Sequence, residues 1–434
     1  MEILQGQVRC ACGKYHRGIL EDYLIEKGAV SKVADFVARY GCRKPFLIAD
    51  EASFGAAGAQ VEKNLADHGI AFSKYIFPAG PKPDEHSVGA AMMHYDTSCD
   101  MILAVGSGVI NDISKIVASV TGHPYIIVAT APSMDGYASG TSSMERDGLK
   151  VSINSKCANV VIGDIDILKN APQRMLISGL GDMIAKYVSI CEWRLGHIIT
   201  GEYYCEEVAN LIRTAAKKCT DNALGLLNRD ENAIAAVFEG LILGGVGMNY
   251  AEVTRPASGV EHYFSHIWDM RALEFGTPSD FHGIQCVIGT LYAVRVYEQL
   301  RKITPDRQKA LDHARTFDLE ALYGELRSFI GTGGETMIAV GKKEGMYDLD
   351  KHAQRLDTIL THWEELVQIM DEELIGAAEL EALLHTLGAP TSAGQIGIDD
   401  ALVPITFRLT KDIRDKYVLS RLCWDLGVLD EMKL

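Results

Sequence analysis

Residues 101–115 read Met-Ile-Leu-Ala-Val-Gly-Ser-Gly-Val-Ile-Asn-Asp-Ile-Ser-Lys, and this stretch decides the fold. The apolar run 101–105 predicts a buried strand, and the residues from Val109 onward continue with helical spacing. Gly106 and Gly108, on either side of Ser107, let the backbone of the turn approach a ligand closely, because neither carries a Cβ atom. The following helix directs unpaired N–H groups and its positive dipole end at this turn. We therefore expect a diphosphate here, although the short motif is also compatible with a plain tight connection.

A second group of polar residues follows the next predicted strand, residues 125–129. Open α/β sheets bind their ligands beyond the carboxyl ends of the strands, so the segment 130–139 is expected to line the same site. The candidate ligand-binding groups of the segment are the aliphatic hydroxyls of Thr130, Ser133 and Ser139 and the carboxylate of Asp135.

Strands and helices alternate from the N-terminus to about residue 165. The predicted strands of this part are residues 44–50, 71–77, 101–105, 125–129, 150–153 and 159–165. Beyond Pro172 the apolar positions recur every three and four residues, and strand signals nearly vanish. The fold class is therefore α/β plus all-α. A Rossmann-like parallel-sheet domain, residues 1–170, precedes an all-helical domain, residues 171–434.

The composition excludes several classes of partner. The chain has 434 residues, a formal net charge of −16 and no basic run, which disfavours nucleic acid and anionic membranes. The start, residues 1–5, lacks the features of a signal peptide. The longest apolar region, residues 233–248, is interrupted by Glu239 and reads as a buried helix, so we expect no membrane span.

The ten cysteines are scattered without the spacing of a disulfide framework, which favours reduced thiols and a cytoplasmic location. Cys10 and Cys12, with His16 nearby, have ligand chemistry but not the spacing of a zinc finger, and no second pair is evident. An ordinary structural role is the favoured interpretation of these three residues.

Asp50 ends the first strong strand and has two possible roles. An acid at the end of a strand in a nucleotide-binding sheet accepts hydrogen bonds from the ribose hydroxyls and repels a 2′-phosphate, which favours NAD over NADP. Alternatively, Asp50 caps the helix that follows it. The spacing alone fits both roles.

The helical half contains three residues of metal-ligand type beside glycine, Asp182, His262 and His282. Glycine inside a helix lowers stability by roughly 1 kcal/mol against alanine, so its repeated presence suggests a close approach at these positions. Two imidazoles and one carboxylate suit a catalytic zinc or a similar divalent ion. The long gaps between the three residues give no support of their own. Taken singly, a capping aspartate or a hydrogen-bonded core histidine is the more common case.

Five motifs, taken in order along the chain, resemble the glycerol-1-phosphate dehydrogenase family. That family lies within the superfamily of iron-containing alcohol dehydrogenases, glycerol dehydrogenases and dehydroquinate synthases. The motifs are Gly106-Ser-Gly-Val-Ile-Asn-Asp112, Thr130-Ala-Pro-Ser-Met-Asp-Gly-Tyr-Ala-Ser139, Gly179-Leu-Gly-Asp182, Arg255-Pro-Ala-Ser-Gly-Val-Glu-His262 and Phe281-His-Gly283. The stretch Ile413-Arg-Asp-Lys-Tyr417 also resembles the family's C-terminal end. Elsewhere in the superfamily the turn often has three glycines, whereas Ser107 stands second here.

The resemblance implies an NAD(P)-binding domain and a helical metal-binding domain. It implies that Asp182, His262 and His282 bind one divalent metal, Zn²⁺ or Ni²⁺, and that Asp135 contacts the substrate hydroxyls. The cofactor-binding residues would be Gly106, Ser107, Gly108 and Asp112 at the diphosphate and Thr130, Ser133 and Ser139 at the nicotinamide. The expected reaction is reduction of dihydroxyacetone phosphate to sn-glycerol 1-phosphate, and all four of Asp135, Asp182, His262 and His282 would be catalytic.

A phosphorylated substrate needs cations or imidazole N–H groups to hold its dianion. The sequence offers Lys150, Lys156, Arg255 and His266 as candidates, without an order among them. His266 lies four residues after His262, so both would share one face of a helix. We also expect a small-molecule substrate and assembly into a homodimer or a larger homo-oligomer.

Three rival functions stay open from the sequence. A glycerol or polyol dehydrogenase would act on the unphosphorylated substrate. A dehydroquinate synthase-like lyase would use the same cofactor and metal, but its ring substrate would call for more basic residues. A non-catalytic, nucleotide-sensing protein would have no need of Asp182, His262 and His282.

Overall fold

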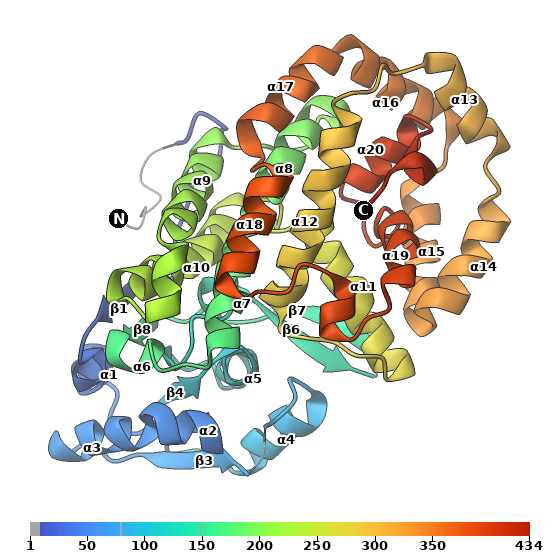
Figure 1. Cartoon of the computed structure of the whole chain (residues 1–434). Helices are drawn as coiled ribbons and strands as arrows, with labels where there is room; N and C mark the ends of the chain where they lie inside the picture. The colour runs from blue at the N-terminus through green and yellow to red at the C-terminus, as the bar shows by residue number, and fades with distance from the viewer. Residues whose placement is uncertain (1–8, 79, 148) are drawn as a thin grey trace. The chain divides into compact units, whose positions relative to one another are not determined.

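The computed structural model describes residues 9–78, 80–147 and 149–434, which form two compact units (Figure 1). The first, here called the α/β unit, consists of residues 1–183 and 210–253. The second, the helical unit, consists of residues 184–209 and 254–434. The N-terminal residues on which the absence of a signal peptide was predicted lie outside the described residues.

The α/β unit is organised around a six-stranded sheet with the strand order β1-β8-β5-β4-β2-β3. All neighbouring strands of this sheet are parallel. Its strands are β1 (Asp22–Glu26), β2 (Pro45–Asp50), β3 (Ser73–Phe77), β4 (Met101–Gly106), β5 (Tyr125–Ala129) and β8 (Val160–Asp164). Every residue of β4, β5 and β8 is buried, as expected for central strands that are covered on both faces. The parallel α/β architecture predicted from the sequence is confirmed.

Helices cover the sheet because each presents an apolar face to it. One face packs against η1 (Ala29–Lys32), α1 (Val33–Arg39) and α3 (Ala59–Asp67), through a core that includes Val37, Leu47, Val61 and Leu103. The remaining helices of this unit are α2 (Glu51–Ser53), η2 (Phe54–Gly58), α4 (Glu85–Met93), α5 (Gly108–Thr121), η3 (Asp135–Ala138), α6 (Ile165–Leu168), α7 (Gln173–Ile184), most of α9 (Glu206–Asp221), η4 (Ala223–Asn228) and α10 (Glu231–Ala251).

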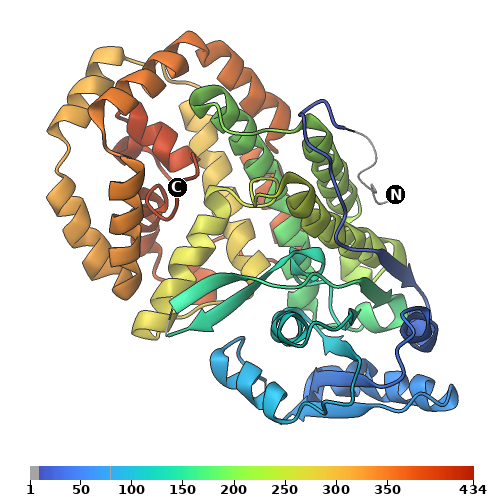
Figure 2. The same cartoon turned by 180° about the vertical axis from the view of Figure 1, so that it is seen from behind.

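One predicted strand of this part belongs to a different sheet. Residues 149–154 form β7 (Leu149–Asn154), which pairs antiparallel with β6 (Thr141–Arg146) in a separate two-stranded hairpin. Figure 2 shows this hairpin as two teal arrows. Strand β6 begins just after the segment 130–139, which is expected to line the ligand site.

The long apolar helix α10 is a core helix of the α/β unit. It is long and apolar enough to cross a membrane, yet 78% of its most apolar window is buried inside the protein. Phe238 of α10 lies so close to Gly163 of β8 that a Cβ atom at 163 would be 2.2 Å from the Phe238 ring. This agrees with the expectation of a buried helix rather than a membrane span.

The helical unit contains no strand among its described residues. Its helices are α8 (Lys186–Thr200), α11 (Val260–Phe275), α12 (His282–Leu300), α13 (Arg307–Thr316), α14 (Leu319–Ile330), α15 (Thr332–Glu344), α16 (Leu349–Thr361), α17 (Trp363–Glu373), α18 (Ala377–Leu387), η5 (Ala393–Ile396), η6 (Asp400–Leu402), α19 (Val403–Thr410), α20 (Leu419–Asp425) and η7 (Leu429–Glu431). Helices α11 and α12 run side by side and carry the two predicted histidine ligands (Figure 1).

The change from alternating strands and helices to helices alone falls near residue 170, as predicted. Packing divides the chain at other places, because most of α9 and all of α10 cluster with the sheet while α8 clusters with the later helices. The domain ranges 1–170 and 171–434 stay a prediction.

Candidate functional site

The strand order creates one switch point in the α/β unit, between β2 and β4. From β2 the chain moves to β3 on one side, and then returns to β4, β5 and β8 on the other. Crevices at such a point, beyond the carboxyl ends of the strands, are where open α/β sheets bind nucleotides. Asp50 ends β2, and the turn Gly106-Ser107-Gly108 joins β4 to α5. The two cofactor motifs predicted from the sequence therefore flank the switch point.

The glycine turn is shaped by close packing of strand and helix. A Cβ atom at Gly106 would lie 2.5 Å from the Cβ of Ile110, so only glycine allows α5 to start here. The Asn111 N–H donates to the Ser107 carbonyl at 2.9 Å, and the Thr130 N–H donates to the Gly106 carbonyl at 3.1 Å. Helix α5 is 14 residues long, and the N–H groups of its first turn suit an anionic diphosphate.

Asp112 contacts the hairpin that follows the ligand segment. Its backbone carbonyl accepts a hydrogen bond from the Ser142 hydroxyl at 3.1 Å. Burial raises the pKa of the Asp112 carboxyl to about 6, although Lys115, a backbone hydrogen bond from Ser143 and the charge of Lys150 favour its ionised form. Lys150, a predicted phosphate-binding residue, therefore lies in the electrostatic environment of Asp112.

Asp50 caps the helix that follows it. Its Oδ1 accepts the Ser53 N–H at 2.7 Å, and the Ser53 hydroxyl in turn accepts the Asp50 N–H at 3.1 Å, which completes a capping box. The capping role is thus present. It occupies one carboxylate oxygen, so a ribose-binding role for the other oxygen remains compatible with the geometry.

Lys115, a buried residue that was not predicted to have a role, fixes the end of the segment 130–139. The Lys115 side chain is fully buried on α5, and its ammonium group donates to the Gly136 carbonyl, the Ser139 hydroxyl at 3.0 Å and the Thr141 carbonyl at 3.0 Å. Burial lowers the pKa of Lys115. Ser139 is therefore part of the support of the segment. The sequence gives no spacing signal for this role, because Ile113 and Val117, each two positions away, lie on the other side of the helix from Lys115.

Two helices hold the Asp135 segment through glycines. A Cβ atom at Gly179 of α7 would lie 1.9 Å from the Pro132 carbonyl oxygen, and one at Gly245 of α10 would lie 2.9 Å from the Asp135 carbonyl oxygen. The Ser178 hydroxyl donates to the Ser133 carbonyl at 2.9 Å. The close approach that the sequence suggests at Gly179 is thus an approach to the chain's own backbone.

Asp182 is linked directly to this segment. It is fully buried on α7, and its Oδ2 accepts the Asp135 N–H at 2.9 Å. The predicted substrate residue and the predicted carboxylate ligand are therefore brought together within the α/β unit.

The helical unit brings His262 and His282 together. Their ring centroids are 5.0 Å apart, His262 on α11 and His282 at the first position of α12. The Nδ1 of His262 lies 2.7 Å from Oε1 of Glu261, and the Nδ1 of His282 lies 3.1 Å from the Ser265 hydroxyl. A carboxylate on Nδ1 fixes the tautomer whose Nε2 lone pair is available to a metal.

The donor set of the helical unit fits a divalent transition metal. Cys286 Sγ lies within 3.8 Å of both ring nitrogens of His282, and ligand-type atoms of His262, His282 and Cys286 all lie within 4.8 Å of one another. Imidazole nitrogens suit zinc and nickel, and oriented imidazoles are typical of metal sites. Cys286 was not predicted. Its spacing of four residues from His282 on one helix face is the signal that was available.

A pair of buried carboxylates supports these histidines and was also missed. Glu192 on α8 accepts the Val260 N–H at 2.9 Å and the Leu419 N–H at 2.8 Å. A Cβ atom at Gly259 would lie 2.5 Å from a Glu192 oxygen and 2.7 Å from a Glu261 oxygen, so the two carboxylates approach each other over this glycine. Burial and the neighbouring Glu261 raise the pKa of Glu192.

The predicted phosphate-binding residues are divided between the two units. The Lys156 ammonium group donates to the His123 carbonyl at 2.5 Å and lies in the α/β unit, as does Lys150. Arg255 and His266 belong to the helical unit. Arg255 donates through Nε to Glu202 at 2.7 Å, and the His266 ring lies 6.3 Å from that of His282.

Cys12 and His16 form a small contact in the α/β unit. Cys12 Sγ lies 3.4 Å from the Nε2 of His16, whose Nδ1 lies 2.9 Å from the Tyr250 carbonyl oxygen. The carbonyl partner fixes the tautomer of the His16 ring, an arrangement found in structural and in metal-binding histidines alike.

The comparisons with known proteins define a class of protein first. The family described as iron-containing alcohol dehydrogenase matches residues 24–172. Glycerol dehydrogenase from Schizosaccharomyces pombe is similar in structure, with a TM-score of 0.62 and 16% identity over 95% of this chain and 89% of that one. NADH-dependent butanol dehydrogenase A from Thermotoga maritima has a TM-score of 0.57 and 17% identity, with 95% and 97% coverage. The fold is that of the iron-containing alcohol dehydrogenases.

Sequence relatives narrow the class to one family. Glycerol-1-phosphate dehydrogenase [NAD(P)+] from Bacillus velezensis is 30% identical over 349 residues, 78% of this chain and 88% of the relative. The protein of the same name from Pyrococcus furiosus is 33% identical over 290 residues, 66% of this chain and 82% of the relative. The chain belongs to the glycerol-1-phosphate dehydrogenase family.

Proposed function

We propose that this protein is an oxidoreductase that reduces dihydroxyacetone phosphate to sn-glycerol 1-phosphate with NAD(P)H, reversibly and with a divalent metal. The observation that carries the proposal is the pair His262 and His282, each held at Nδ1 by a partner of its own unit. The switch point of the sheet, flanked by Asp50 and the glycine turn, supports the proposal that a dinucleotide cofactor binds there.

In this proposal Asp182, His262 and His282 bind the metal, which is Zn²⁺ or Ni²⁺. When bound, the ion supplies Lewis-acid polarisation of the C2 carbonyl, and the nicotinamide supplies the hydride. Asp135 binds the substrate hydroxyls from a segment fixed by Lys115, Asp182 and α10. The glycine turn and the first turn of α5 bind the diphosphate, and Thr130, Ser133 and Ser139 shape the nicotinamide side.

Asp50 supports a preference for NADH over NADPH. Its carboxylate stands at the end of β2, where a 2′-phosphate of NADPH would meet a like charge. The helix-capping bond uses Oδ1 only, so the same residue serves the fold and the cofactor. We propose a homodimeric or larger assembly and a cytoplasmic location. These two points rest on the expectation from the sequence.

The rival functions differ from the proposal in one measurable property each. A polyol dehydrogenase would reduce dihydroxyacetone as well as its phosphate. A dehydroquinate synthase-like lyase would release product by elimination without net oxidation of NADH. A nucleotide-sensing protein would bind NADH without turnover, but the oriented histidines at 5.0 Å favour retained chemistry.

The test is an NADH-oxidation assay with dihydroxyacetone phosphate and with dihydroxyacetone, each on metal-free protein and after addition of zinc or nickel. We expect turnover of the phosphate ester only, restored by one of the two metals, with the 1-phosphate enantiomer as product. Equal kcat/KM for the two ketones would return the chain to the polyol dehydrogenase function. Formation of the 3-phosphate enantiomer would contradict the proposed stereochemistry.

A further inference from the structure

Several hydrogen-bond donors in the helical unit lie close together without enough acceptors. Arg255 has an exposed fraction of 3% and Tyr263 one of 0%, yet among the described residues Nη1 of Arg255 and the hydroxyl of Tyr263 have no hydrogen-bond partner. A buried donor left unpaired lowers stability by about 1–3 kcal/mol, so two of them in one neighbourhood call for an explanation.

Two further cations adjoin these donors. The ammonium group of Lys416 lies 5.9 Å from the centroid of the Tyr263 ring and donates to the Ser258 carbonyl at 2.9 Å. Arg414 is half-buried, and its charge acts on both Tyr263 and Lys416. Arg255, Tyr263, Arg414 and Lys416 are here called the donor cluster, and all four belong to the helical unit.

The carboxylates around the donor cluster leave two of its donors without an acceptor among the described residues. Glu202 pairs with Nε and Nη2 of Arg255, and Nη1 has no acceptor among the described residues. Glu192 accepts two backbone N–H groups, and Glu261 accepts the Gly259 N–H and contacts His262. Asp415 is exposed.

The protonation of Lys416 reflects this shortage of anions. Removal from water and the charges of Arg255 and Arg414 lower the pKa of Lys416 to about 7, although Glu261 and Glu192 act in the opposite direction. A bound dianion would supply the counter-charge that the ammonium group lacks.

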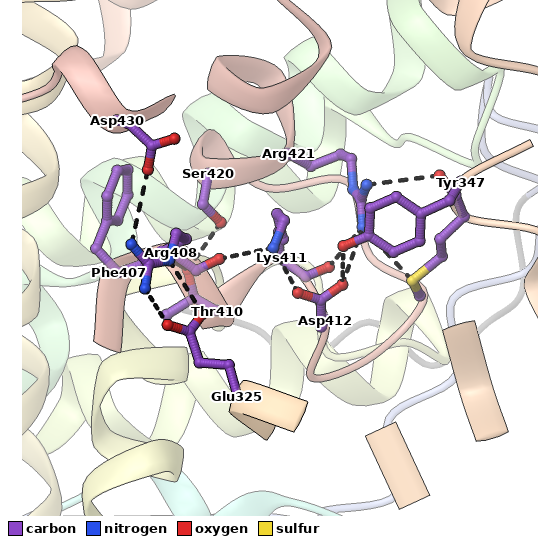
Figure 3. A network of polar contacts seen from close by, with 11 residues as sticks. Glu325, Tyr347, Phe407, Arg408, Thr410, Lys411, Asp412, Ser420, Arg421 and Asp430 are labelled. Carbon is purple, nitrogen blue, oxygen red and sulfur yellow. Dashed lines mark hydrogen bonds and ion pairs between the residues drawn. The ribbon is translucent and has the colours of Figure 1, made fainter. Parts of the chain in front are cut away.

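The segment that carries Arg414 and Lys416 is fixed at both ends. Before it, Lys411 donates to Asp412 at 2.6 Å, and Asp412 also accepts from Tyr347 and pairs with Arg421 (Figure 3). After it, the Tyr417 carbonyl accepts from Nη2 of Arg255 at 2.8 Å, and the Tyr417 hydroxyl donates to Asp425 at 2.8 Å. The backbone that carries Arg414 and Lys416 is therefore held from both sides before any ligand arrives, which favours binding.

The donor cluster lies near the histidine pair of the same unit. Tyr263 directly follows His262 on α11, its ring lies 6.0 Å from that of His266, and the His266 ring lies 6.3 Å from that of His282. The Tyr263 side chain is thus linked to the histidine pair through the ring of His266, within the helical unit.

We propose that Arg255, Tyr263, Arg414 and Lys416 form the subsite that holds the phosphate group of the substrate. Four separate donors match the several oxygens of a phosphate dianion, whereas one guanidinium fork satisfies a carboxylate, as Glu202 shows on Arg255. This inference rests on the proposed function. It retains Arg255 from the residues predicted for phosphate and places Lys150 and Lys156 outside the subsite.

The test uses the metal-loaded protein and two variants that remove donors without removing a side-chain partner. Tyr263→Phe removes a hydroxyl that has no partner, and Lys416→Met keeps the length of the side chain. The matched controls are Tyr297→Phe, which removes another buried hydroxyl without a partner, and Lys302→Met at an exposed site. KM and kcat are measured for dihydroxyacetone phosphate and dihydroxyacetone, and the dissociation constant of inorganic phosphate is measured by calorimetry.

We expect each of the two variants to raise KM for the phosphate ester by about 10-fold to 100-fold, the range for loss of a hydrogen bond to a charged group. The dissociation constant of phosphate should rise in parallel, and the slow reaction of dihydroxyacetone and both controls should change less than about twofold, within the range of neutral contacts.

Three results would overturn the inference while the proposed function stands. They are an unchanged KM in both variants of an enzyme that prefers the phosphate ester, equal losses of kcat with both ketones, and unchanged phosphate affinity. An unmodified enzyme that reduces both ketones equally well would instead contradict the proposed function.

Discussion

The two units build their candidate site residues in opposite ways. In the α/β unit the residues follow strand ends and turns, and the backbone supplies much of the chemistry, through Gly106, Ser107 and the first turn of α5. In the helical unit the backbone is regular, and the chemistry comes from side chains of α11 and α12 that are held by buried carboxylates and hydroxyls. A turn tolerates change in nearby side chains, whereas a set of converging side chains depends on each member.

The largest effect is expected at the histidines. His262→Ala or His282→Ala should abolish activity, because two ligands cannot hold a catalytic divalent ion as three do. The chain should still fold, since one ion does not support a core of this size. Activity and bound metal, measured by elemental analysis, check this, and His385→Ala at an exposed site is the control. Full activity in either histidine variant would contradict the view that the helical unit depends on each of its converging side chains.

A smaller effect is expected at Glu261, which positions His262 without contacting substrate. Glu261→Gln keeps the volume but weakens the hold on Nδ1, so the metal should bind about 10- to 100-fold more weakly. The metal affinity is measured by competition with a chelator, and kcat at saturating metal should change much less than affinity. Glu364→Gln, on the exposed first turn of α17, is the control. An unchanged affinity would show that Glu261 serves only the packing of α11.

The α/β unit should respond through its backbone. Gly179→Ala places a Cβ atom against the Pro132 carbonyl, and such overpacking lowers the free energy of unfolding by about 1–3 kcal/mol. Gly89→Ala in α4 meets no atom within 4 Å and should stabilise by about 0.5–1 kcal/mol. Urea denaturation of both variants gives the comparison. Equal free energies of unfolding for the two variants would contradict the close approach of α7 to the segment 130–139.

The smallest effect is expected at the cofactor end of β2. Asp50→Asn keeps an acceptor for the Ser53 N–H and removes the charge, so relative use of NADPH should rise. A change of roughly fivefold corresponds to about 1 kcal/mol, the interaction of two charges 4 Å apart in water. Asp50→Gly should raise the ratio as well but also lose the cap. The ratio of kcat/KM for NADPH to that for NADH checks both, and an unchanged ratio excludes Asp50 as the ribose-binding residue.

Sequence reasoning succeeded where the signal was local. The parallel sheet and the change to helices could be predicted because apolar runs and spacing report burial and periodicity directly. The glycine turn and the segment 130–139 could be located because they follow buried strands.

It failed where the partner was distant in sequence. The role of Lys115 could not be predicted, because its acceptors in residues 136–141 lie more than 20 positions away in the sequence. Glu192 supports α11 from a helix almost 70 residues earlier, a relation that no spacing encodes. Gly179 was correctly singled out, but its cause is a neighbouring carbonyl and not a ligand.

The contacts of Lys115, Gly179 and Gly245 also determine how the segment 130–138 moves. With one helix against its start, another against its end and an ammonium group bound to its Gly136 carbonyl, this segment shares the stability of the core. Local opening requires loss of buried contacts, so its backbone amides should exchange with solvent nearly as slowly as those of β4 and β5. In the proposed function, Asp135 is then a fixed point around which the ligand adjusts, and any closure over the substrate comes from other parts of the chain.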